Sequence, residues 1–157
     1  AFGPASAADA QAFTGLKGLA ASFELLRPEL VVFRDERGRE LFDLPDAPRP
    51  DDGIPAPPRF LPEFDSLLLA HADRSRIVAD EHRAGLVTKN LRVRACFLVD
   101  GVVAGTWATA RTRKAATLEL VAFARLPTRV AKTLTAEGER LVRFVEPDAV
   151  SYAVRLA

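Results

Sequence analysis

The 157-residue chain is 48% hydrophobic and 27% charged, so it can bury a core in one domain or in two small ones, and a fully disordered state is excluded. Its formal net charge is only +1, so total charge alone does not indicate a nucleic-acid partner. No apolar run reaches the ~18 residues of a membrane span. The single cysteine, Cys96, excludes an internal disulfide and fits a reducing compartment, so we expect a cytoplasmic protein. Because methionine is absent, we also expect a piece of a longer chain.

The first 44 residues have the pattern of two short helices followed by a hairpin. Ser6 and Asp9 have the spacing of a capping box, and Thr14-Gly15 ends the helix that they begin. Apolar residues then recur at helical spacing until Pro28, and a polar turn over 34–39 separates two apolar runs. The expected helices cover 7–13 and 16–26, and the expected strands cover 30–33 and 41–42. Helix, helix, hairpin is the order of a winged helix, which we predict over 1–44.

Residues 45–62 contain seven of the eleven prolines and should form an extended linker. The remaining residues, 63–157, are predicted to form a β-barrel-like C-terminal domain. Asp100-Gly101 is a strong hairpin signal between strands expected over 92–99 and 102–107. Further elements are expected at 67–69 (strand), 116–123 (strand), after Pro127 (helix) and 151–156 (strand). The fold class is therefore α+β, a winged helix followed by a small antiparallel β-barrel or sheet with a packed helix.

Charge is distributed unevenly along the chain. Residues 1–58 carry 6 Lys and Arg against 10 Asp and Glu, whereas residues 59–157 carry 16 against 11. Between Arg74 and Lys114 there are nine basic and three acidic residues, an excess that could neutralise several phosphates if it lies on one face, and could equally be solvated surface. The predicted DNA-binding residues come from this region and from the positions just before it: His71, Asp73, Arg74, Arg76, Arg92, Arg94, Arg111, Arg113 and Lys114.

The reasons for choosing these residues differ between three groups. Within 71–76, two arginines could grip phosphates while His71 and Asp73 orient them; alternatively, Asp73 pairs with an arginine and the segment is a structural corner. Arg92 and Arg94 alternate with a valine and should share a strand face. The turn over 111–114 has three cations and no acid, which suits a DNA backbone or a minor groove, or a solubilising tip. No metal site and no cofactor are predicted, because the two histidines and Cys96 lack a recognisable ligand spacing.

The segment Leu61-Pro-Glu-Phe-Asp-Ser-Leu-Leu-Leu-Ala-His-Ala-Asp-Arg-Ser-Arg76 resembles a signature of the crosslink-repair, YcaQ/AlkZ-like winged-helix DNA glycosylases. The similarity extends back to Ala1-Phe-Gly-Pro-Ala-Ser and forward through Val99-Asp-Gly and Gly105-Thr-Trp107 to Glu137-Gly-Glu-Arg140. In that family several winged helices precede a C-terminal β-barrel. The resemblance therefore implies that the chain is the last winged helix and the barrel of such a protein.

The resemblance also implies which chemistry the chain lacks. The family's catalysis is attributed to a Gln-x-Gln or Gln-x-Asp motif in the N-terminal winged helices, which positions a water for attack on the glycosidic carbon. Gln11, the only glutamine, is followed by Ala12 and Phe13. We therefore predict no catalytic residue in this chain. The expected function is double-stranded DNA binding as the C-terminal module of a repair glycosylase. Open alternatives are a transcription regulator using the winged helix, or part of an active enzyme joined to N-terminal winged helices.

Overall fold

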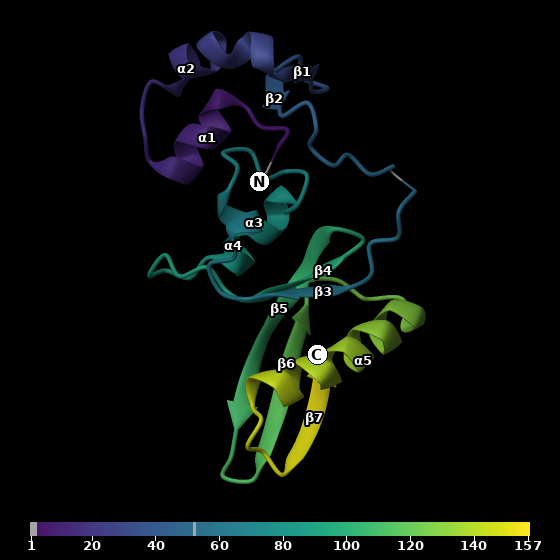
Figure 1. The fold of residues 1–157 in the computed structure, drawn as a ribbon. Coiled ribbons are helices and arrows are strands. Elements are labelled where there is room, and N and C mark those ends of the chain that lie inside the picture. Colours follow the sequence, from purple (N-terminus) through teal and green to yellow (C-terminus); the bar gives the residue numbers. More distant parts are fainter. Residues whose placement is uncertain (1–2, 52) are drawn as a thin grey trace. The chain divides into compact units, whose positions relative to one another are not determined.

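The computed structural model describes residues 3–51 and 53–157, and contacts divide the chain into two compact units (Figure 1). We call residues up to 54 together with 66–74 the N-terminal unit, and residues 55–65 together with 75–157 the C-terminal unit. Segment 66–74, which the sequence placed after the linker, thus packs with the first 54 residues. No helix in the described part of the chain has the length and apolarity needed to cross a bilayer.

The N-terminal unit has the helix, helix, hairpin order expected from the sequence. Strands β1 and β2 pair antiparallel with Phe33 opposite Leu41. Few side chains of this unit are fully buried: the apolar ones are Leu41, Phe42, Leu68 and Ala70. Its elements are α1 (Ala7–Thr14), α2 (Leu19–Leu26), a 3-10 helix (Arg27–Glu29), β1 (Val31–Arg34), β2 (Glu40–Asp43) and α3 (Ser66–Leu69).

The ends of α1 and α2 explain where the prediction succeeded and where it slipped. The Ser6 hydroxyl accepts from the Asp9 amide and the Asp9 carboxylate accepts from the Ser6 amide, which confirms the capping box. Gly15 ends α1 in the left-handed region with φ 73°. Helix α2 begins at Leu19, later than predicted, because Gly18 is also left-handed and the Gln11 side-chain oxygen accepts from the Leu19 amide at 3.0 Å. Gln11 therefore has a capping role.

The strand predicted over Leu67–Leu69 is wrong, since these residues belong to α3. The Ala70 amide donates to the Ser66 carbonyl at 2.8 Å and closes a helical turn. Leu68 and Ala70 are buried. A run of only four apolar residues carries no usable periodicity, so it fits a short strand and a helical turn equally well.

The C-terminal unit contains an open five-stranded sheet in the order β3-β4-β5-β6-β7. Of the predicted β-barrel or sheet, the described residues form a sheet and no closed barrel. The sheet is not wholly antiparallel, because β7 runs parallel to β6. The reason is the connection: α5 links β6 to β7, and a helical crossover returns the chain to the same end of the sheet. The elements are β3 (Arg59–Leu61), a 3-10 helix (Asp80–His82), α4 (Arg83–Leu86), β4 (Cys96–Val99), β5 (Val102–Arg111), β6 (Ala115–Ala122), α5 (Thr128–Val145) and β7 (Ser151–Leu156).

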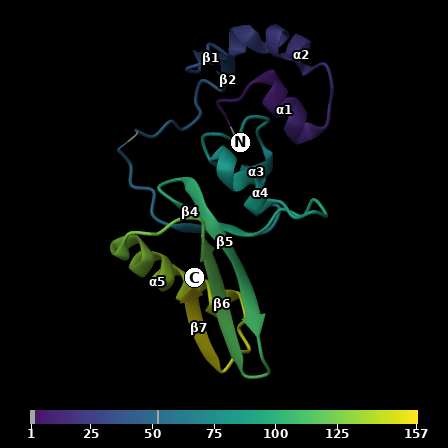
Figure 2. The same cartoon turned by 180° about the vertical axis from the view of Figure 1, so that it is seen from behind.

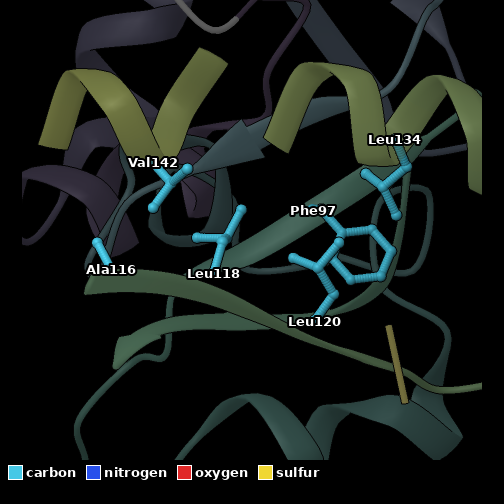
Figure 3. Packing of buried hydrophobic residues seen from close by; sticks show 6 residues of the cluster. All are labelled: Phe97, Ala116, Leu118, Leu120, Leu134 and Val142. Carbon is cyan, nitrogen blue, oxygen red and sulfur yellow. The ribbon is translucent and has the colours of Figure 1, made fainter. Parts of the chain in front are cut away.

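The core of this unit lies between α5 and one face of the sheet (Figure 3). Leu134 and Val142 point from the helix toward Leu118, Leu120 and Phe97, and all five are fully buried. Close approach of the helix is possible because Gly138 faces the sheet. A Cβ there would lie 3.0 Å from the Leu118 side chain. These contacts determine which side of α5 faces the sheet and therefore which side faces away from it.

Other boundaries in this unit differ from expectation. The end of the predicted linker forms the edge strand β3, which pairs with β4. The Asp100-Gly101 hairpin turn is confirmed, with positive φ at both residues. However, β4 begins only at Cys96, so Arg92 and Arg94 do not lie on this strand. Between them Val93 forms an isolated bridge with Val87.

Candidate nucleic-acid interface

The segment 71–74 is anchored to the start of α1 by Asp9. This carboxylate is only 6% exposed and accepts three hydrogen bonds, from the Ser6 amide (2.8 Å), the Ser6 hydroxyl (2.7 Å) and the Ala72 amide (2.8 Å). Burial alone would raise the pKa of Asp9, but the hydrogen bonds from Ser6 and Ala72, helped by the nearby His71, lower that pKa below its usual value. The carboxylate thus holds the N-terminus of a helix and a distant loop together.

Asp73 joins the same segment to the turn of the β1–β2 hairpin. It accepts from Arg39 at 2.8 Å and from Arg37 at 3.2 Å. Arg39 also binds Asp35 at 2.7 Å. The turn arginines are therefore already held by carboxylates, which leaves them less available to phosphates. The geometry gives this turn a bracing role.

His71 and Arg74 lie beside this ionic cluster. The Arg74 guanidinium folds back on its own turn and donates to the His71 carbonyl at 3.1 Å. The Nδ1 atom of His71 is buried and has no hydrogen-bond partner among the described residues. The structure thus brings His71, Asp73 and Arg74 together in one corner of the N-terminal unit.

Arg76, Arg92 and Arg94 belong to the C-terminal unit and are exposed. Arg92 donates to Glu63 through two nitrogens at 2.7 and 2.9 Å, so part of its charge is neutralised. Arg92 and Arg94 are both exposed while Val93 between them is buried, so the predicted alternation holds although the strand does not. No ion pair involves Arg76 or Arg94 in the part of the chain that the structure describes.

The turn between β5 and β6 lies at the end of the sheet away from β3, as both views show (Figure 1, Figure 2). Arg113 and Lys114 are exposed there and have no ion pair among the described residues. Arg111 binds Glu146, which follows α5, at 2.5 Å. The Lys114 carbonyl accepts from Val150 at 2.8 Å, which ties the turn to the start of β7.

The sequence-predicted residues therefore form separate groups, a corner at 71–74, the exposed arginines at 76, 92 and 94, and the turn at 111–114. Among the predicted residues, four are exposed and have no ion pair with a described residue: Arg76, Arg94, Arg113 and Lys114. All four belong to the C-terminal unit. Sequence reasoning missed the tertiary role of Asp9. Its capping-box spacing was visible, but nothing local indicated that its second oxygen would bind Ala72.

The chain is similar in fold to part of a solved DNA glycosylase. The chain matches a solved structure of the Streptomyces sahachiroi DNA glycosylase AlkZ with a TM-score of 0.72 and 22% sequence identity, over 99% of this chain and 42% of that one. The chain thus spans less than half of that protein's length. No curated protein matches it significantly. The sequence profile described as "DNA glycosylase AlkZ-like" matches residues 1–144, so the chain belongs to this family. The family resemblance expected from the sequence is confirmed.

Proposed function

We propose that the chain is a DNA-binding module of an AlkZ-like DNA glycosylase that grips the sugar-phosphate backbone of double-stranded DNA and does not itself cleave the glycosidic bond. The N-terminal unit is proposed to be a winged helix, on the strength of its element order. The observation that carries the proposal is the β5–β6 turn, where Arg113 and Lys114 are exposed and form no ion pair with any residue that the structure describes. Unpaired cations on a turn suit phosphates, which carry no sequence information.

The proposed lack of activity follows from the glutamine content. Base release needs a positioned water, and the family's motif for it requires a second polar residue two positions after a glutamine. Gln11 is followed by Ala12 and Phe13, and its side chain caps α2. In this proposal the N-terminal winged helices of the same protein would supply the catalytic residues, and this chain would supply affinity.

The test is a salt titration with a single charge removed. Each phosphate contact contributes about −0.9 to the slope of log affinity against log salt concentration. Arg113→Gln should flatten the slope by about one unit and leave the preference among duplex sequences unchanged. Arg155→Gln, which removes an exposed charge from β7, is the matched control and should leave the slope unchanged. A strong sequence preference that disappears with Arg113→Gln would favour base readout and contradict the proposal.

A further inference from the structure

Four basic side chains share the outward face of α5. Arg129, Lys132, Arg140 and Arg143 fall within an arc of about 80° on a helical wheel, opposite the buried Leu134, Gly138 and Val142. All four are exposed. They span about 21 Å along the helix axis at 1.5 Å per residue. Ala136 lies between the two pairs, so no bulky side chain blocks the middle of this face.

These cations, which we call the α5 basic face, are partly preorganised by the fold. Arg143 lies over the ring of Tyr152 at 4.5 Å, and Arg140 forms an ion pair with Glu137 at 3.2 Å. Arg129 and Lys132 have no ion pair among the described residues. Glu137 and Glu139 are the only acidic residues in the helix, so its charge is net positive.

The α5 basic face continues into the β5–β6 turn. Arg111 lies directly opposite Ala116 in the strand register, so its side chain lies on the sheet face that α5 covers. There it binds Glu146, just after the end of the helix. The ties between this turn and the start of β7 place Arg113 and Lys114 at the same end of the unit.

On β6 and β7, the charges on the opposite face of the sheet cancel. Arg155 and Glu119 occupy paired positions on β7 and β6 and alternate with the buried residues that face α5. Thr117 and Val121 are the neighbouring β6 residues on that face. At β6 and β7, the two faces of the sheet therefore differ in charge.

We propose that the outer face of α5 is a second contact surface for the DNA backbone, so that one duplex runs along α5 and the β5–β6 turn rather than over the opposite face of the sheet. This inference rests on the proposed function and adds the side of the unit on which DNA lies. Each strand of B-DNA presents a phosphate about every 3.4 Å along the axis, so a face about 21 Å long spans roughly six phosphates. In this proposal each of the four cations neutralises one backbone phosphate.

The experiment compares two double variants in a salt titration with a short duplex. Arg129→Gln with Lys132→Gln removes two cations that make no ion pair with a described residue, so loss of fold is not expected. Lys17→Gln with Arg155→Gln removes the same charge from outside the α5 basic face. The first pair should flatten the slope by about 1.8, and the second should leave it unchanged. Circular dichroism is the check that both variants are folded.

The outcomes separate this inference from the proposed function. If the unaltered chain binds duplex DNA with a salt-dependent affinity but the α5 pair behaves like the control pair, DNA binding stands and the α5 surface is wrong. If the control pair flattens the slope as much as the α5 pair, binding depends only on total charge, and the inference that DNA lies along α5 is wrong. If the unaltered chain does not bind duplex DNA, the proposed function fails first and the inference fails with it.

Discussion

Replacing the buried carboxylate of Asp9 should destabilise the N-terminal unit more than any other single polar change. Asp9→Ala removes half of the capping box, which costs about 1 kcal/mol. It also leaves the Ala72 amide without its charged acceptor, which costs about 2 kcal/mol. The free energy of unfolding should therefore fall by about 3 kcal/mol, which is about 6 to 12 °C in melting temperature for a chain of this size. Thermal and urea unfolding followed by circular dichroism at 222 nm measure it.

Asp9→Asn removes the negative charge of the side chain while keeping its size and shape. Since the pKa of Asp9 is lowered by folding, the carboxylate stabilises the fold above its unfolded-state pKa near 3.8, and this contribution is lost as the pH falls through the lower folded-state pKa. The gap in stability between the wild type and Asp9→Asn should therefore shrink at pH 3 relative to pH 7. Asp148→Ala is the control for an exposed aspartate, with an expected change below about 0.5 kcal/mol. An Asp9→Ala variant that unfolds at the wild-type midpoint would refute the reasoning.

Three further predictions follow from other parts of the chain. The purified chain should release no base from alkylated or crosslinked DNA, and activity that persists through repurification would contradict this. Cys96 is fully buried. Burial, with a smaller contribution from the Asp65 carboxylate, raises the pKa of the Cys96 thiol to about 12. Iodoacetamide at pH 8 should therefore label Cys96 only after unfolding. Gly105→Ala should lower stability by about 2 kcal/mol or more, because its Cβ would overlap the Val121 carbonyl oxygen and the Phe97 ring; an unchanged urea midpoint would show that the strands can separate there.

Local signals in the sequence were sufficient for most elements of the fold. Capping by Ser6, the Asp100-Gly101 turn and the helical spacing after Pro127 each depend on residues close together in the chain, and each led to the correct element. The same is true of the last strand, whose position at 151–156 was correct. The pattern of this strand did not indicate its direction. The direction depends on the helical crossover, which makes β7 parallel to β6.

The candidate site was harder to predict because its geometry depends on distant partners. The sequence identified Asp73 as a polar residue near arginines, but Arg37 and Arg39, its partners in the structure, lie more than 30 positions earlier. The charge excess after Arg74 was visible in the composition, but only the structure shows which of these cations are exposed and which form ion pairs. The α5 basic face was missed because its spacing appears only when the buried face of the helix is known.

The salt dependence of duplex binding by the unaltered chain tests the central claim most directly. Four exposed cations predicted from the sequence have no ion pair among the described residues: Arg76, Arg94, Arg113 and Lys114. Four phosphate contacts give a slope near −3.6, or steeper if the α5 basic face takes part, so affinity should fall at least about 150-fold between about 50 and 200 mM salt. Fluorescence anisotropy with a labelled plain duplex measures this slope. A slope indistinguishable from zero would contradict a backbone-gripping DNA module.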